Sequence, residues 1–204
     1  MHERLLLLTL TALPALGFEE PTRQKLTVRV VDHASIPPAT LRRATLEAEA
    51  IFRRSGLETQ WLPCLPEECG RSVPDSQLVI RILAPSMEGH KTSRHRLGIA
   101  IPTESRVYIF YSEVESSRLA HEYSLPVLLA SVMAHEAAHL LGLEHTDIGI
   151  MRGGFTAKEI EQAAVGLMRF DETQAIRLRT EIQARLEEGQ AFASAAPSPV
   201  TRWP

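Results

Sequence analysis

The sequence contains few cysteines, few aromatic residues and no strong excess of charge of either sign. Its 204 residues include 22 basic and 25 acidic side chains, a net charge of −3, and aromatic residues make up only 5%. No stretch combines a basic run with interleaved aromatic residues, so nucleic acid is not indicated as a partner. No internal repeat is present, and no apolar run reaches the ~20 residues that span a bilayer. We therefore expect a single globular domain with a hydrophobic core.

The first 17 residues, MHERLLLLTLTALPALG, have the pattern of a signal peptide. A short, weakly positive start precedes an apolar run, and small residues follow where a signal peptidase inspects the chain. An amphipathic or core helix is the alternative, but the run is apolar all round. We expect export, with no stable membrane anchor after cleavage. The domain is then expected at residues 18–190, and a disordered tail rich in Ala, Ser and Pro at residues 191–204.

The most informative stretch is His135-Glu136-x-x-His139-x-x-Gly142-x-x-His145. His135 and His139 stand four apart, so on a helix they lie about 6 Å apart on one face and can share one metal ion. Gly142 suits the end of that helix, because glycine adopts positive φ at little cost. The chain can then turn and bring His145 to the same ion. Three histidine ligands with one coordination position open are typical of catalytic zinc, so the sequence predicts one catalytic Zn²⁺ ion.

Glu136 follows the first histidine directly and is expected to face the same cleft. A carboxylate there can take a proton from a water molecule beside the metal, which produces a nucleophile near neutral pH. Ordinary surface or core histidines are the plain alternative. Five matched positions within eleven residues favour the metal site.

Together with Met151, six residues after the last histidine, this pattern resembles that of the metzincin metallopeptidases. The resemblance implies that the three histidines bind zinc and that Glu136 is the general base. It also implies that Met151 lies in a tight turn below the metal as a hydrophobic floor. The match covers about seventeen residues, so it indicates the site and leaves the subfamily open.

The order of expected elements indicates an α/β fold with a short sheet. The resemblance implies a zincin domain in which a short twisted mixed sheet lies over the active-site helix and a helical subdomain lies below. Hydrophobic periodicity and turn residues predict strands at residues 26–31, 58–62, 77–83, 97–102 and 106–111, and helices at residues 39–54, 124–141, 156–168 and 172–188.

Gly98, Ile99 and Ala100 lie in an expected edge strand. In metzincins the strand that faces the cleft runs antiparallel to the bound peptide, and the resemblance gives that role to these three residues. The free main-chain groups of an edge strand can pair with the backbone of an extended peptide. An ordinary edge strand without a ligand is equally compatible with the sequence.

A second class of HExxH proteins uses a glutamate further along the chain as its third ligand. Glu159 or Glu161 would supply it here. That alternative leaves the spacing from Gly142 to His145 unexplained, so His145 is favoured.

The only two cysteines, Cys64 and Cys69, lie in an irregular insert rich in Pro and Gly. Cys69-Gly70 followed by a Val-Pro-Asp sequence looks somewhat like the inhibitory cysteine segment of the matrixins. That segment precedes the first strand in the family, whereas the insert follows the second expected strand. In an exported protein two nearby cysteines most simply pair, so a disulfide is predicted.

These observations predict an exported zinc-dependent endopeptidase that acts on a peptide or protein in extended conformation. A zinc-containing binding protein without turnover is the alternative from another class. Hydrolysis of a non-peptide amide is a third possibility that the metal chemistry permits.

Overall fold

The computed structural model describes residues 25–69, 74, 76–87 and 96–195. The expected signal peptide, residues 1–17, and residues 196–204 of the expected tail lie outside the described residues, as do parts of the insert after Cys69. Within the described ranges, no helix has the length and apolar character needed to cross a membrane.

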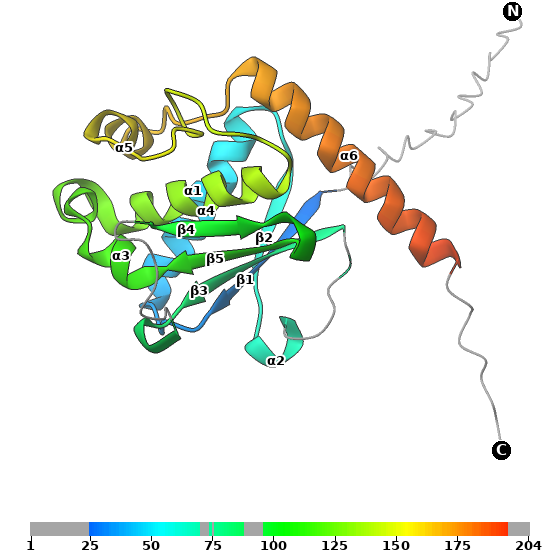
Figure 1. The fold of residues 1–204 in the computed structure, drawn as a ribbon, viewed down its shortest axis with the longest axis horizontal. Helices are drawn as coiled ribbons and strands as arrows, with labels where there is room; N and C mark the ends of the chain where they lie inside the picture. Colours follow the sequence, from blue (N-terminus) through cyan, green and yellow to red (C-terminus); the bar gives the residue numbers. More distant parts are fainter. Residues whose placement is uncertain (1–24, 70–73, 75, 88–95, 196–204) are drawn as a thin grey trace, which may run out of the picture.

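Five strands form one mixed sheet, as the resemblance implied (Figure 1). Their order across the sheet is β2-β1-β3-β5-β4. The first four of these run parallel, and β4 runs antiparallel to β5 at the edge. The strands are β1 (Leu26–Asp32), β2 (Thr59–Pro63), β3 (Gln77–Leu83), β4 (Gly98–Ile101) and β5 (Arg106–Phe110).

Six α-helices and three short helical turns complete the described chain. The turns are η1 (Pro85–Met87), η2 (Pro102–Glu104) and a π-helical turn, η3 (Ala120–Ser124). The helices are α1 (Pro38–Arg54), α2 (Pro66–Cys69), α3 (Tyr111–Ser116), α4 (Leu125–Leu140), α5 (Ala157–Ala164) and α6 (Glu172–Ala195).

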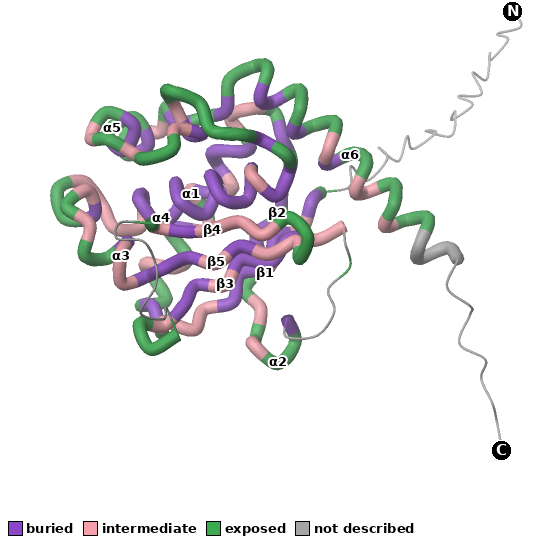
Figure 2. The backbone as a smooth tube through the Cα atoms, viewed as in Figure 1, coloured by how far each residue is buried: buried purple, intermediate pink, exposed green. Residues whose placement is uncertain are grey.

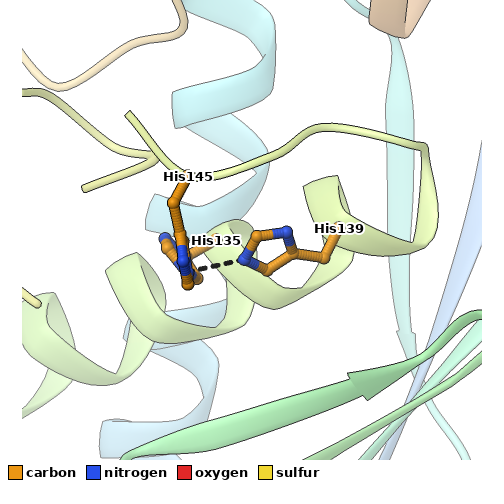
Figure 3. Close-up of side chains that lie close together, drawn as sticks. All are labelled: His135, His139 and His145. Atoms are coloured by element: carbon orange, nitrogen blue, oxygen red, sulfur yellow. Dashed lines mark hydrogen bonds between the residues drawn. The ribbon is translucent and has the colours of Figure 1, made fainter. Parts of the chain in front are cut away.

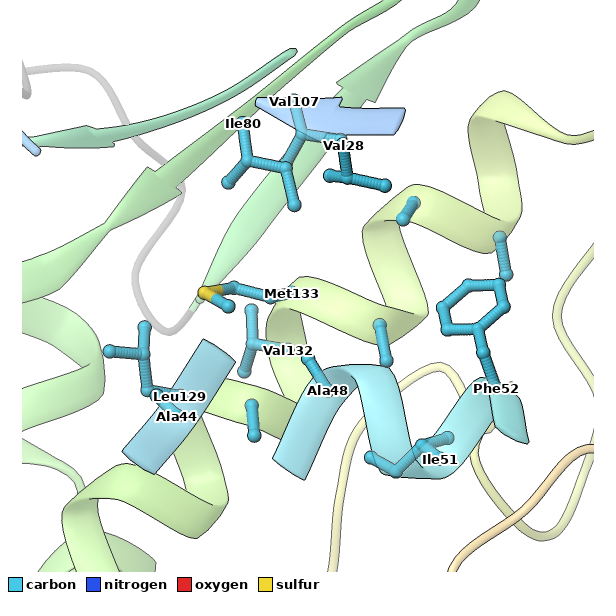
Figure 4. Packing of buried hydrophobic residues seen from close by; sticks show 14 of the residues in the cluster. Val28, Ala44, Ala48, Ile51, Phe52, Ile80, Val107, Leu129, Val132 and Met133 are labelled. Atoms are coloured by element: carbon cyan, nitrogen blue, oxygen red, sulfur yellow. The ribbon is translucent and has the colours of Figure 1, made fainter. Parts of the chain in front are cut away.

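The core lies between one face of the sheet and the helices α1 and α4 (Figures 2 and 4). Alternate strand residues such as Val28, Ile80 and Val107 point at these helices, because successive side chains of a strand face opposite ways. α4 is apolar on all sides and buried along most of its length, which is typical of a central helix. Met133 of α4 is fully buried in this layer. Full burial of each large apolar side chain in this layer stabilises the folded state by roughly 1.5–3 kcal/mol.

The opposite face of the sheet is only partly covered. Val31, Val79 and Cys69 form a small buried cluster there, and Cys64 packs against it. Cys64 and Cys69 form the predicted disulfide, which joins the short helix α2 to the end of β2. The insert is thus less irregular than expected.

Several element boundaries differ from the expected ones. β5 ends at Phe110, and Tyr111 already begins α3, a helix that the sequence did not indicate. α5 ends at Ala164, four residues early, because the chain turns at Gly166 with a φ of 73°. α6 continues to Ala195, five residues into the expected tail, as alanine favours helix.

Candidate metal centre

α4 carries His135, Glu136 and His139, and it ends in a motif that reverses the chain. Gly142 has a φ of +79°, which a residue with a side chain rarely adopts. The Gly142 N–H donates to His139 O at 3.0 Å, and the Leu143 N–H donates to Ala138 O at 3.0 Å. This pair of bonds is the Schellman motif, and it turns the following residues back along the helix. His145 is thereby returned toward the two helical histidines.

The structure brings the three predicted histidines together (Figure 3). His135 Nε2 lies 3.0 Å from His139 Nε2 and 3.3 Å from His145 Nε2. A tetrahedral zinc ion with Zn–N bonds of about 2.0–2.1 Å requires nitrogen–nitrogen separations of about 3.3–3.4 Å. Two of the three separations are thus close to this value, and the three ligand atoms all lie within 4.8 Å of one another, so the cluster can hold a single zinc ion.

The hydrogen bonds of the two helical histidines fix which ring nitrogen carries hydrogen. His135 Nδ1 lies 2.7 Å from Ile150 O, and His139 Nδ1 lies 2.6 Å from Leu143 O. A carbonyl oxygen only accepts, so both Nδ1 atoms donate, and in the neutral rings both Nε2 atoms present lone pairs. Two lone pairs at 3.0 Å repel each other unless a cation stands between them. The arrangement is suited to a metal ion, and such carbonyl partners orient metal-binding histidines.

Burial keeps these rings neutral. It lowers the pKa of His135 to about 4, despite the opposing hydrogen bond to Ile150, and it lowers the pKa of His139. At neutral pH the Nε2 atoms of these two rings therefore carry no proton, which leaves their lone pairs available to a metal ion.

Residues 142–152, which we call the metal-site loop, hold His145 in place. The Thr146 N–H donates to Met151 O at 2.8 Å, and the Arg152 N–H donates to Gly149 O at 3.2 Å. The Arg152 guanidinium donates to Asp147 O at 2.9 Å and to Gly154 O at 3.0 Å. Met151 is fully buried and directly follows Ile150, whose carbonyl accepts from His135. The loop thus closes on itself next to the histidines.

Glu136 lies in the same cleft as the histidines, and the residue is 8% exposed. Burial raises its pKa to about 7, although the nearby Arg96 guanidinium and a hydrogen bond from the Ala100 N–H oppose the shift. A carboxyl group with a pKa close to neutrality can both take up and release a proton under physiological conditions.

β4 forms one wall of this cleft, and Gly98, Ile99 and Ala100 are among the lining residues. The Phe110 N–H donates to Leu97 O at 2.9 Å. Because hydrogen-bonded and non-hydrogen-bonded pairs alternate along antiparallel strands, the main-chain groups of Leu97 and Ile99 point toward β5. The main-chain groups of Gly98 and Ala100 then point away from β5, to the edge of the sheet. The cleft has a volume of about 1340 Å³.

The two glutamates of the alternative HExxH class do not belong to the histidine cluster. Glu159 accepts a hydrogen bond from the Thr156 N–H at 3.0 Å and lies 3.9 Å from Arg152 Nη1. Burial alone would raise the pKa of Glu159, but these partners outweigh it and hold that pKa below its ordinary value. Glu161 is exposed. Within the described residues, the metal-binding group that forms contains only histidines.

Sequence reasoning missed the groups that support the histidines. Two are the main-chain carbonyls of Ile150 and Leu143, which carry no side-chain signal. Phe155 packs edge-on against His135, with ring centroids 5.6 Å apart. Arg152 stands next to Met151, but only the folded loop shows that its guanidinium bonds to two carbonyls.

No protein-family model matches the chain, and no curated protein matches its sequence. Among solved structures, a zinc-dependent peptidase from Methanocorpusculum labreanum is similar, with 13% identity and a TM-score of 0.50. The match covers 74% of this chain and 99% of that chain. Archaemetzincin from Methanopyrus kandleri matches with 10% identity and a TM-score of 0.51, over 80% of this chain and 98% of that chain. At such identities the likeness establishes the fold, so this chain has the fold of zinc-dependent peptidases.

Proposed function

We propose that this protein is an exported zinc-dependent metalloendopeptidase of the metzincin type. The three clustered histidines are the ligands of one zinc ion, and Glu136 is the general base. The observation that carries the proposal is the convergence of three histidine Nε2 atoms in the cleft that also contains a buried carboxylate. The shared fold of the two zinc peptidases supports it.

Zinc, when bound, lowers the pKa of water and polarises the scissile carbonyl. The Glu136 carboxylate takes the proton from the attacking water and then donates it to the leaving amine. Met151, buried beside the carbonyl of Ile150, serves as the floor of the site.

The substrate is a peptide segment in extended conformation. The main-chain groups of Gly98 and the carbonyl of Ala100, on the edge of the sheet, would pair with its backbone as in strand addition, whereas the Ala100 N–H already bonds to Glu136. Ile99, which alternates with them, bonds to β5 and supports the edge from behind. Pairing along a strand recognises a stretch of backbone rather than a chain end, which favours an endopeptidase.

Export is supported by the disulfide between Cys64 and Cys69, since disulfides persist mainly in oxidising compartments. Mass spectrometry of the protein recovered from the extracytoplasmic fraction tests this part of the proposal. We expect a chain that starts at Phe18. A full-length chain found only in the cytoplasm contradicts export.

The zinc content of three chains tests the site: the wild type, His145→Ala and Glu136→Gln. We expect about one zinc per wild-type chain, a sharp loss in His145→Ala and full retention in Glu136→Gln. The exposed His121, which is not part of the cleft lining, provides the matched control His121→Ala. Only the wild type and this control should cleave an unfolded protein.

Full zinc retention by His145→Ala would remove that residue as a ligand. Zinc in the wild type without cleavage of any unfolded protein would favour a non-catalytic binding protein over a peptidase.

A further inference from the structure

Gly98 lies where the edge strand β4 passes over the side chain of Glu136. A Cβ at position 98 would lie 2.9 Å from Glu136 Cγ, 3.0 Å from Glu136 Oε1 and 3.1 Å from Ile109 Cδ1. Packed carbon atoms normally stand at about 3.5–4.0 Å. Any residue other than glycine therefore requires its neighbours to move.

The backbone conformation does not explain the glycine. Gly142 has a positive φ and empty space around its missing side chain, whereas the φ of Gly98 is not positive. An alanine can adopt the backbone angles of Gly98. What excludes it is the space that Glu136 occupies.

Glu136 has little freedom to yield. Its Cγ stands two bonds from the backbone of a buried helix, where χ1 is restricted to rotamers that avoid the preceding turn. Its carboxylate also accepts the hydrogen bond from the Ala100 N–H. A Cβ at position 98 would push the side chain away from this donor, and hence away from its place in the cleft.

We propose that Gly98 is a positioning residue for the reaction, an inference that rests on the proposed role of Glu136 as the base. The missing side chain leaves the space through which Glu136 extends along β4 to the Ala100 N–H. Because β4 is also the proposed edge for the substrate backbone, one strand sets the position of the base and of the peptide relative to each other. Gly98 thus acts through Glu136 rather than by contact with the metal.

The kinetic test compares zinc-loaded wild type with Gly98→Ala on an unfolded protein or a fluorogenic peptide. We expect kcat to fall about 10- to 100-fold, since misplacing a reacting group by about 1 Å has an effect of this size. KM should stay within about twofold, and zinc content should stay at one per chain. An unchanged kcat, or a higher KM with kcat unchanged, overturns the inference and leaves Gly98 as a substrate-binding residue only.

A thermal-stability cycle tests the same contact without reference to activity. Gly98→Ala should lower Tm by about 3–10 °C through overpacking. In a Glu136→Ala background, which lacks Cγ and the carboxylate, at least half of this loss should disappear. In a Glu136→Gln background, which keeps the length of the side chain, the loss should remain.

Ile109→Val is the matched control, because it removes only the Cδ1 atom near Gly98. If Ile109→Val restores Tm and Glu136→Ala does not, Gly98 is a core-packing residue and the inference is wrong. A wild type that cleaves nothing overturns the proposed function, while the Tm cycle still decides whether Gly98 fixes the position of Glu136.

Discussion

His135 and His145 bring their Nε2 atoms to the same place from regions of opposite character. α4, which carries His135, contacts the sheet, α1 and α5 and is buried along most of its length. The metal-site loop is largely exposed around His145 and is held by its own hydrogen bonds and by Arg152. A change in α4 should therefore reduce the stability of the whole domain. A change in the loop should weaken zinc binding while the domain stays folded.

Met133→Ala should produce the largest loss of stability. Met133 is fully buried between the sheet and α1, and removing its side chain leaves a cavity in the core. We expect the free energy of unfolding to fall by about 2–5 kcal/mol, measured by urea denaturation of the metal-free chain. Met133→Leu, which nearly conserves volume, should lose less than about 1.5 kcal/mol. Equal losses in the two variants would contradict tight packing around α4.

Glu136→Gln should change the pH dependence of stability. The pKa of Glu136 is raised to about 7, so the folded chain holds an extra proton between about pH 4.5 and 7, and its stability falls as pH rises through this interval. The pKa of His135 is lowered to about 4, so its contribution rises with pH up to about 6.5. The two effects oppose each other in the metal-free wild type.

Removing the glutamate should therefore make stability rise more steeply between pH 4.5 and 6.5, by up to about 1.4 kcal/mol per pH unit. Urea denaturation in the presence of a chelator at several pH values measures this. The exposed Glu161, which is not part of the cleft lining, provides the control Glu161→Gln for the loss of one carboxylate. Parallel profiles for the wild type and Glu136→Gln would refute the raised pKa.

Gly142→Ala should cost about 1–2 kcal/mol, because an L-residue is strained at a φ of +79°. The strain also falls on the turn that returns His145, so zinc affinity should drop as well. Isothermal titration and urea denaturation measure the two effects. Gly154→Ala is the matched control for stability, since its φ is not positive and nothing stands within 4 Å of its missing Cβ. A Gly142→Ala variant as stable as that control would contradict the strained turn.

Arg152→Gln should have the smallest effect on stability, below about 1.5 kcal/mol, because its hydrogen bonds are partly exposed to water. Zinc affinity should nevertheless fall about two- to tenfold, since the loop that carries His145 loses its tie between Asp147 and Gly154. Competition with a fluorescent chelator measures this change. Arg169→Gln, at an exposed position, controls for the lost charge. A large loss of stability with unchanged zinc affinity would contradict the expectation that changes in the metal-site loop weaken zinc binding while the domain stays folded.

Much of the fold could be predicted because its signals are local. The strand at residues 77–83 agrees with β3 at both ends, since a run of β-branched and apolar residues between turn residues defines it. The start of α3 could not be predicted in this way. Tyr111 continues the apolar run of β5, and only the pairing with β3, which ends at Phe110, shows where the strand stops.

At the metal site, too, some features follow from local sequence signals and others only from the folded structure. The spacing of the histidines, Gly142 and Met151 is a property of one short segment, so helix geometry and the cost of positive φ suffice to predict that the three rings converge. The two carbonyls that bond to His135 and His139 belong to the backbone, which looks alike at every position. No residue type marks them.

The sequence by itself determined the ligand spacing, the helix end at Gly142 and the residue types of the predicted site. Only the tertiary structure decided that Gly98 lies against Glu136 and that β4 is the edge of the sheet. The physical reason is the range of the interactions. Helix periodicity and turn angles act over a few residues, whereas the packing of a strand on a helix depends on where the whole chain places both.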